Sequence, residues 1–402
     1  MPLPNPVFLL VPYRYSTGSN SGSVFSQLPT NGTGDFIFTR STTGSYINSS
    51  GFIATSSAHE PRIFNYYSGS NTCPGFLIEP SAQNLCLQSE ALNTSPWTLP
   101  SGYATITPNA ILSPANTLTA DQIIYTTEST ARANQVIVLS NSTTYTLSAF
   151  IKNNTFVSGE VGRVLLRFEN NLNSPNDFDM RAVIDPTNIG AATFSLIGTA
   201  GTGTSGTVSG SVQDYGNGWW RVRVTGTTGA AAATATANLR IQQSGLQSVG
   251  DNITRSLYVW GVQLETGSVA TSYIPTTTAA VTRNADVLTD TSYTLPTPSG
   301  SIYSEFIASR TASYYVHSVG PVPITTGSNC IAITYTNSNI SVYKNGAFVV
   351  SQSIGTYPIG GNIINLGHSS GSFQLNDNLL SFAIYDSTLS AADAISLTSG
   401  SI

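Results

Sequence analysis

Alternating apolar and polar positions run through most of the chain and predict a succession of β-strands. Residues 163–169 are typical, because Val164, Leu166 and Phe168 fall on one side of an extended strand while the charged residues fall on the other. Residues 144–151 alternate in the same way. Turn-forming residues separate these runs, and helical periodicity is missing from them. The pattern therefore predicts an all-β fold of tandem β-sandwich or jelly-roll domains.

Two Asn-Gly pairs predict tight hairpins, at residues 217–218 and 345–346. The strand that follows the first pair reads WWRVRVTG. Period two places Trp220 with the valines of this strand and Trp219 with its arginines. We therefore expect Trp220 in the core and Trp219 on the opposite face.

One short helix is predicted near the C-terminus. Ser390 is a good N-cap residue, and Asp393 stands three residues later, which is a variant of the capping box. Leu389 is placed to pack on Ala394 as a hydrophobic staple.

Changes in composition along the chain predict five segments. The first carries three prolines before an apolar patch, Val7 to Val11, which has no obvious partner within its own segment. We expect an extended N-terminal arm at 1–33, a β-rich segment at 34–85, a jelly-roll domain at 86–275, a linker at 276–300 and a β-sandwich at 301–402.

Charge is scarce in this sequence. Only 9% of the 402 residues are charged, against about 25% in an average protein, while 40% are hydrophobic. The net charge of −5 and the shortage of clustered cations argue against nucleic-acid binding. No apolar run approaches the roughly 20 residues of a membrane span, and the N-terminus lacks the pattern of a signal peptide. We therefore expect no membrane insertion, and release from the cytoplasm by another route.

No motif in the sequence predicts catalysis. The three histidines are not in a metal-binding spacing, no serine lies in a GxSxG elbow, and the glutamates are scattered. Glu79 and Glu265 are expected to hold loop backbone rather than to act as acids. We expect no cofactor. Asp377 is a candidate Ca²⁺ ligand, but it is a single carboxylate for a site that needs six to eight oxygens.

The three cysteines do not form a disulfide framework, because an odd count leaves one without a partner. Cys86 lies where an apolar residue is expected, so a buried thiol is favoured there over a disulfide with Cys73.

Sugar binding is the other chemistry that the sequence permits. It requires aromatic platforms flanked by amide and hydroxyl groups on a rigid sandwich. Trp97 and Trp219 are the candidate glycan contacts, with Tyr215 near the second. The alternative role for Trp219 is packing against its neighbouring arginines or against another subunit, since aromatic residues and arginine are enriched at protein interfaces.

Two segments carry a resemblance to a known family. RSLYVWGVQLETGSVATSYIPTTTAAVTRNAD (255–286) resembles the close of the middle domain of bacteriophage fibre and appendage proteins. GDFIFTRSTTGSYINSSGFIATSSAHEPRIFNY and PGFLIEPSAQNLCLQSEAL, both within 34–92, resemble the N-terminal part of the same proteins. The middle domain also resembles carbohydrate-binding jelly rolls, and 301–402 resembles a laminin-G or concanavalin-like sandwich.

The resemblance implies a structural protein of the virion, a head or tail fibre without enzymatic activity. It implies a homotrimer that is assembled in the host cytoplasm and that attaches to other virion proteins through its N-terminal arm. The host-facing ligand would be a surface glycan. The alternatives are a secreted bacterial carbohydrate-binding protein and a virion polysaccharide depolymerase. A β-helix repeat would favour the depolymerase, and the sequence has no fixed-period repeat.

Overall fold

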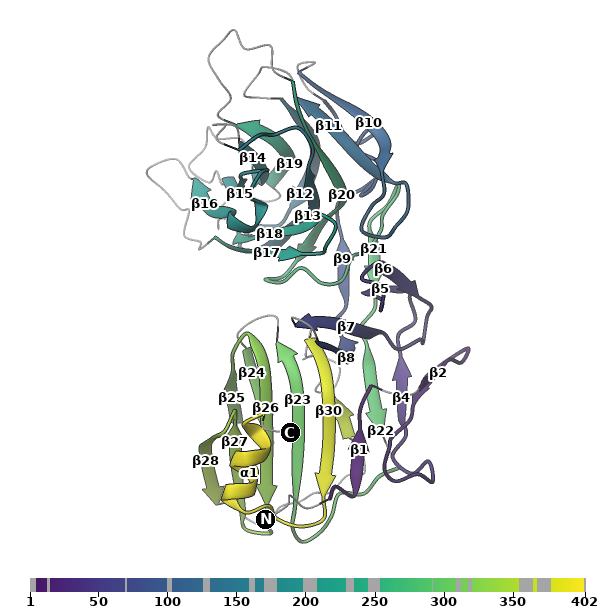
Figure 1. Ribbon diagram of the computed structural model, residues 1–402, viewed down its shortest axis with the longest axis vertical. Coiled ribbons are helices and arrows are strands. Elements are labelled where there is room, and N and C mark those ends of the chain that lie inside the picture. Colours follow the sequence, from purple (N-terminus) through teal and green to yellow (C-terminus); the bar gives the residue numbers. More distant parts are fainter. Residues whose placement is uncertain are drawn as a thin grey trace. The chain divides into compact units, whose positions relative to one another are not determined.

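The polypeptide folds into antiparallel β-sheets, as its alternation predicts, and the described residues include a single α-helix (Figure 1). This is a computed structural model, and it describes residues 5–12, 15–68, 71–99, 103–125, 131–158, 163–169, 179–197, 208–228, 235–244, 254–290, 292–308, 312–316, 320–353, 364–366 and 377–400. The chain divides into two units. Unit 1 comprises Met1–Ser50, Ala54–Ser81 and Asn284–Ile402, and unit 2 comprises Gly51–Ile53 and Ala82–Arg283.

Unit 1 is built on an eight-stranded sheet. Its strands are, in spatial order, β28 (Ala347–Ser353), β27 (Asn339–Lys344), β26 (Gly327–Tyr335), β23 (Gly300–Ala308), β30 (Asp377–Tyr385), β8 (Asn71–Ile78) and β7 (Ile63–Ser68), with β1 (Phe8–Leu10) also paired to β30. The 345–346 turn joins β27 to β28, and both of its residues have positive φ, as an Asn-Gly hairpin requires.

A five-stranded sheet completes unit 1. It contains β2 (Tyr15–Ser16), β3 (Gly22–Val24), β4 (Phe36–Thr39), β22 (Val287–Asp290) and β29 (Ile364–Leu366). Side chains from both sheets, such as Phe36 and Leu288 from one and Phe382 from the other, share one buried cluster. Two hairpins, β5 (Gly44–Ile47) with β6 (Ile53–Ser56) and β24 (Ala312–Val316) with β25 (Gly320–Ile324), add to the fold.

The C-terminal helix α1 (Ala391–Thr398) confirms the predicted capping. The Ser390 hydroxyl accepts a hydrogen bond from the Asp393 backbone N–H at 3.1 Å, and the Asp393 carboxylate accepts one from the same hydroxyl at 2.7 Å. Leu389 and Ala394 are both buried in one cluster, as a hydrophobic staple requires.

The expectation of a free N-terminal arm is wrong. Phe8 is 0% exposed, and β1 pairs with β30 from the far end of the chain. Leu10 is also buried, because residues 8 and 10 project to the same face of the strand. The segments expected at 1–33, 34–85 and 301–402 therefore share sheets and a core. The stretch expected as a linker, 276–300, contributes β21 (Val281–Arg283) and β22.

Unit 2 is a β-sandwich of two sheets. The six-stranded sheet has the order β10 (Ala104–Ile111), β11 (Ala120–Tyr125), β20 (Arg255–Thr266), β13 (Thr144–Asn153), β18 (Trp220–Thr227) and β17 (Ser209–Asp214). The five-stranded sheet has the order β12 (Arg132–Leu139), β19 (Ala235–Ser244), β14 (Arg163–Glu169), β15 (Asp179–Ile184) and β16 (Thr193–Ile197). A short 3₁₀ helix, η2 (Ile189–Ala191), precedes β16.

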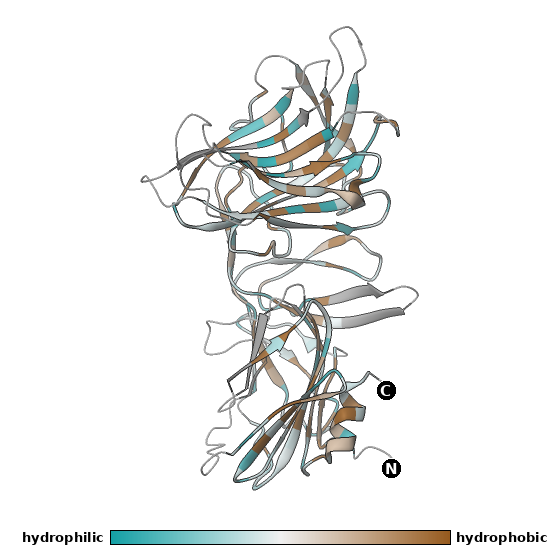
Figure 2. Ribbon diagram, turned by 90° about the vertical axis from the view of Figure 1, so that its left-hand side faces the viewer, coloured by the Kyte–Doolittle hydropathy of each residue, from teal (hydrophilic) through white to brown (hydrophobic). Residues whose placement is uncertain are grey.

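The core between these sheets confirms the predicted alternation. Val164, Leu166 and Phe168 of β14 are buried in the same cluster as Val222 and Val224 of β18. Figure 2 shows the corresponding change between hydrophilic and hydrophobic residues along the strands. The alternate positions of these strands are therefore directed away from this core.

Unit 2 is inserted within unit 1 rather than following it. The chain passes into unit 2 through β9 (Ala82–Asn84) and returns through β21, and these two strands pair antiparallel. The two ends of the inserted segment are therefore held next to each other.

Candidate functional site

Trp97, the first predicted sugar contact, lies in the core of unit 2. Its side chain is only 6% exposed, and its indole N–H donates to the backbone carbonyls of Leu87 and Gln88, both at 3.1 Å. The expectation that Trp97 is exposed is wrong. Its apolar ring and its one donor are both used inside the fold, so it offers no platform on this chain's surface.

Trp219 lies on the opposite face of its strand from Trp220, as predicted, but it is covered rather than exposed. It is 3% exposed and lies in a cluster with Phe150, Trp260 and Tyr273 on the outer side of the six-stranded sheet. Trp220 is partly buried against the central core. Both faces of this strand are covered by apolar side chains, so alternation places the two rings on opposite sides without exposing either.

Tyr215 is the only predicted contact that stays half-exposed. Its ring packs edge-on against Phe150, with the ring centroids 4.9 Å apart. A glycan contact at Tyr215 stays a prediction, and Trp219 cannot extend the platform because its ring is buried.

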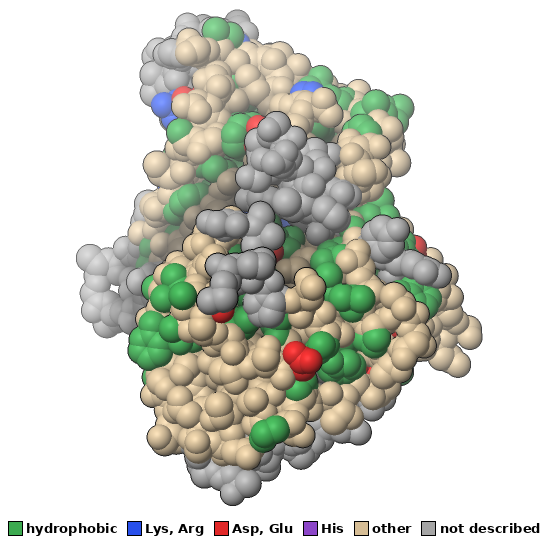
Figure 3. All heavy atoms as spheres, turned by 60° about the horizontal axis from the view of Figure 1, so that its bottom comes forward, with side chains coloured by type: hydrophobic (Ala, Val, Ile, Leu, Met, Phe, Trp, Pro, Cys, Tyr) green, Lys and Arg blue, Asp and Glu red, His purple; other side chains and the backbone are tan. Residues whose placement is uncertain are grey.

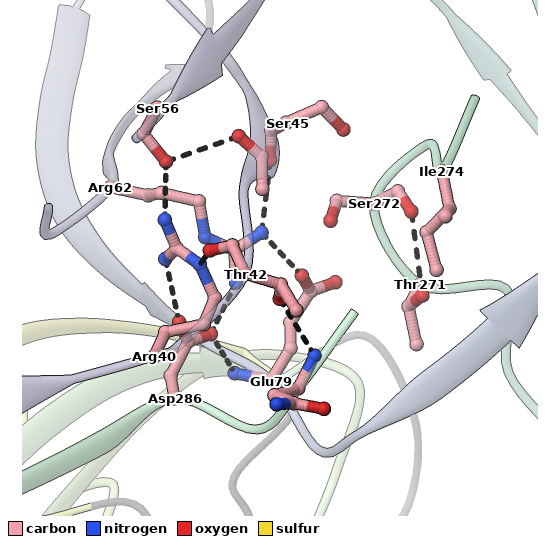
Figure 4. Close-up of polar contacts among 12 residues, drawn as sticks. Arg40, Thr42, Ser45, Ser56, Arg62, Glu79, Thr271, Ser272, Ile274 and Asp286 are labelled. Carbon is pink, nitrogen blue, oxygen red and sulfur yellow. Dashed lines mark hydrogen bonds and ion pairs between the residues drawn. The ribbon is translucent and has the colours of Figure 1, made fainter. Parts of the chain in front are cut away.

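Four charged residues form a buried network in unit 1 (Figure 4). The Asp286 carboxylate accepts hydrogen bonds from the guanidinium groups of Arg40, at 2.9 Å, and Arg62. Arg62 also donates to the Glu79 carboxylate at 2.7 Å, and the Glu79 backbone N–H donates to Asp286 at 2.8 Å. The side chains of both arginines and of Asp286 are 0% exposed.

The network gathers residues from both segments that resemble phage fibre proteins. Arg40, Arg62 and Glu79 come from the N-terminal segment, and Asp286 ends the second segment. Glu79 lies just before the chain leaves unit 1, and Asp286 lies just after it returns. The network therefore links the segment that ends before β9 to the segment that begins after β21. It is closed to a ligand because its side chains are buried.

Glu265 has the structural role that the sequence predicts. Its carboxylate accepts hydrogen bonds from the Thr271 backbone N–H at 3.0 Å and from the Gln263 side chain at 2.6 Å. The Gln263 side chain in turn accepts from the Ile274 N–H at 2.7 Å. Burial raises the pKa of Glu265, and the hydrogen bonds from Thr271 and Gln263 oppose that rise. This carboxylate holds the loop at 271–274.

A cluster of charged residues, which sequence reasoning did not find, lies on the outward side of the five-stranded sheet in unit 2, and its Arg167, Glu169 and Asp179 are buried. We call it the arginine face. It comprises Arg132, Arg167, Arg181, Arg240, Glu169 and Asp179.

Strand register explains how these residues come together. Arg167 of β14 is the direct partner of Arg240 on β19 and of Arg181 on β15, so three guanidinium groups form one row. Glu169 and Asp179 are partners in the next row. Directly paired residues project to the same face of a sheet. The charged side chains therefore form a compact patch although they are distant in sequence.

Each carboxylate on the arginine face is shared by two arginines. Glu169 pairs with Arg167 and Arg240. Asp179 lies 3.0 Å from Arg181 and 3.4 Å from Arg167. Neutral groups flank the row, since the Asn134 side chain accepts a hydrogen bond from Arg240 at 3.0 Å.

The arginine face is partly withdrawn from water. The Arg167 side chain is 9% exposed, and those of Arg181 and Arg240 are 16% and 18% exposed. Burial lowers the pKa of Arg167 to about 10, a shift that Asp179 opposes and that the neighbouring arginines reinforce. Burial and Arg132 lower the pKa of Arg240 to about 10 as well. Burial raises the pKa of Asp179. Groups with shifted pKa values concentrate at functional sites more than elsewhere.

No group of three or more His, Cys, Asp or Glu side chains that could hold a metal ion occurs among the described residues. The side chain of Asp377, the candidate Ca²⁺ ligand, lies outside the described residues. Cys86 is a free, buried thiol, as expected, and burial raises its pKa. In the part of the chain that the structure describes, no helix is long and apolar enough to cross a membrane.

Comparison with known proteins does not identify a family for this chain. No family model matches the chain, and no curated protein matches it. One similar solved structure concerns "the promiscuous specificity of the carbohydrate-binding modules from the beta-sandwich super family". It has 9% sequence identity, covers 65% of this chain and 99% of its own, and gives a TM-score of 0.29. A similarity this low supports no argument about function.

Proposed function

We propose that this protein is a non-catalytic attachment protein that binds a glycan on the arginine face of unit 2. The arginine face carries the proposal, because two of its arginines, Arg181 and Arg240, keep 16% and 18% of their side chains exposed on the outward side of the five-stranded sheet. Buried ion pairs often stabilise a fold less than apolar residues would. A chain with only 9% charged residues therefore has little structural reason to place six of them on one sheet face.

The proposed setting is the surface of a bacteriophage particle, as a head or tail fibre. The support is the sequence resemblance, together with the convergence of its two segments in one buried network. The N-terminal arm is not the proposed attachment route, because Phe8 is part of the core. Antibody labelling of intact virions tests this setting. Specific labelling of fibres is expected, and its absence from purified particles would contradict the assignment.

We further propose a homotrimer held by uncharged contacts. The face of the molecule in Figure 3 carries few charged side chains, which suits interfaces that salt does not screen. Light scattering on the purified chain should give a trimer that persists in molar salt. A monomer, or a trimer that dissociates in salt, would refute this part of the proposal.

A glycan array with the intact protein tests binding. Arg181→Lys is the informative variant, because it keeps the charge but loses the planar fork that recognises oxygen pairs. Arg255→Lys on the six-stranded sheet is the matched control. The native chain and the control are expected to bind the same glycans, and Arg181→Lys is expected to bind them less. If no glycan binds the native chain, the proposed function is wrong.

A second candidate function is glycoside hydrolysis on the virion. Glu169 and Asp179 are direct cross-strand partners, and glycosidases use a pair of carboxyl groups. Burial raises the pKa of Asp179, as a general acid requires. Incubation with polysaccharide distinguishes the two functions. New reducing ends that disappear in Asp179→Asn would establish the enzyme, and their absence favours the binding protein.

A further inference from the structure

We infer that the hairpin of β27 and β28 in unit 1 carries a glycan-binding site of its own, whose ligand is an uncharged sugar stacked on Phe348. This site lies on a different unit from the arginine face and does not depend on it. It follows from the exposure of Phe348, from the strand register that directs its ring, and from the hydroxyl groups beside it.

Phe348 presents a large apolar ring at the edge of the eight-stranded sheet. The residue is 54% exposed, and its strand, β28, is the last in the order of that sheet (Figure 1). The ring of Tyr343 on β27, a residue that is 7% exposed, packs against it edge-on with the ring centroids 5.6 Å apart. Phe348 is therefore held in place by Tyr343 and remains open to a ligand.

A β-bulge directs Phe348 to this face of the sheet. Val342 pairs with Val350 on the inner face, but the next residue, Tyr343, pairs with Phe348, so the register shifts at Val349. Without the shift, Phe348 would project to the inner face, because successive residues of a strand alternate. Bulges re-aim side chains and are over-represented beside functional sites. Here the bulge gives the ring little burial, which favours a contact with another molecule.

A row of hydroxyl side chains lies beside the aromatic pair on the same face. Strand register aligns it across β23, β26, β27 and β28, and it comprises Ser301, Thr334, Ser341 and Ser351. At its exposed end, the Ser351 hydroxyl accepts hydrogen bonds from Ser341 and from the Asn339 side chain, both at 2.9 Å. A hydroxyl that accepts two hydrogen bonds still has a proton to donate. The row is two residues along β27 from the aromatic pair, or about 7 Å, so a sugar stacked on the ring can reach it with its own hydroxyl groups.

The two rows favour an uncharged ligand. The row that contains the aromatic pair comprises Tyr303, Ala332, Tyr343 and Phe348, and like the hydroxyl row it has no charged residue. A charged ligand would lose hydration here without gaining a counter-charge. A sugar offers an apolar ring face to Phe348 and hydroxyl groups to Ser351 and Asn339. A second copy of the chain could cover the ring, but it would also have to supply partners for these polar groups, which a sugar carries itself.

Calorimetry with the full-length protein tests the inference. The probes are neutral hexaoses of glucose, galactose, mannose and N-acetylglucosamine. We expect one of them to bind, and Phe348→Ala to weaken that binding about tenfold because the stacking surface is lost. Phe348→Tyr keeps the ring and should keep the binding, whereas Ser351→Ala should weaken it severalfold by removing a donor. Leu118→Ala, which truncates a 59% exposed apolar residue of unit 2, is the control and should change nothing. Circular dichroism checks that each variant folds.

The outcomes separate this site from the arginine face. Binding that is lost in Phe348→Ala and kept in Arg181→Lys supports the inference. Binding that is lost only in Arg181→Lys would overturn the inference and leave the proposed function in place. Failure of every neutral hexaose to bind would also overturn it, as would equal binding by the native chain and Phe348→Ala. Light scattering covers the other occupant, because a smaller oligomer in Phe348→Ala with unchanged sugar binding would show that the ring is a subunit contact and would refute the site.

Discussion

Asp286→Ala should destabilise unit 1 and leave unit 2 largely unaffected. The Asp286 side chain is 0% exposed and accepts three hydrogen bonds, from Arg40, Arg62 and the Glu79 backbone. Its removal leaves two buried guanidinium groups with one carboxylate. Breaking a buried ion pair typically costs about 3–5 kcal/mol. With an m-value of about 2 kcal/mol per molar urea, the midpoint of unfolding should fall by roughly 2 M.

The chain provides its own reporter for the two units. All four tryptophans, at positions 97, 219, 220 and 260, lie in unit 2. Tryptophan fluorescence therefore follows the unfolding of unit 2, while far-ultraviolet circular dichroism follows both units. We expect the circular dichroism transition to shift in Asp286→Ala and the fluorescence transition to stay in place.

Two variants control for the loss of a side chain. Asp386→Ala removes an exposed carboxylate from the same unit and should have little effect. Asp286→Asn keeps the shape of the side chain and loses only its charge, so its effect should be intermediate. Arg62→Met combined with Asp286→Ala should cost less than the sum of the single changes, because the charges balance again. Equal effects of Asp286→Ala and Asp386→Ala would refute the role of the network.

Three further predictions concern stability. Trp219→Ala should lower the stability of unit 2 by about 3–5 kcal/mol in denaturant unfolding, since its ring is buried, and an effect no larger than that of an exposed residue would contradict this. Burial raises the pKa of Glu265, so its contribution to stability is full below its unfolded pKa and is lost as pH rises through the folded pKa. Glu265→Gln should therefore fold and should flatten the pH dependence of the melting temperature at mildly acidic pH. A steeper pH dependence in this variant would count against the assignment. Ser390→Ala should cost about 1 kcal/mol by removing the helix N-cap, whereas Ser390→Asp, which restores a cap, should not.

Local patterns predicted the elements of this fold well. The alternation at 163–169, the two Asn-Gly turns and the Ser390 cap depend on neighbouring residues, and all are confirmed. The pairing of β1 with β30 could not be predicted, because strands that are distant in sequence carry no mark of their partner. For this reason the sequence alone predicts an N-terminal arm without a partner from the apolar patch at Val7 to Val11.

The candidate site was harder to predict for the same reason. Alternation placed Arg167 and Glu169 on the outer face of their strand. It did not reveal that Arg181 and Arg240 are their neighbours, because that depends on the register of three strands. The burial of Trp219 could not be predicted, because the six-stranded sheet is covered on both sides. A single strand pattern cannot distinguish a covered outer face from an exposed one.

The pairing of β9 with β21 has a consequence for how this protein can change. The inserted segment begins and ends at adjacent points, so a different sandwich with similarly spaced ends could replace it without rerouting the strands of unit 1. The ion pairs of Arg40, Arg62, Glu79 and Asp286 all lie outside the exchanged segment and would be kept. The architecture would thus allow the segment between β9 and β21 to be exchanged while the strand pairing of unit 1 stays the same.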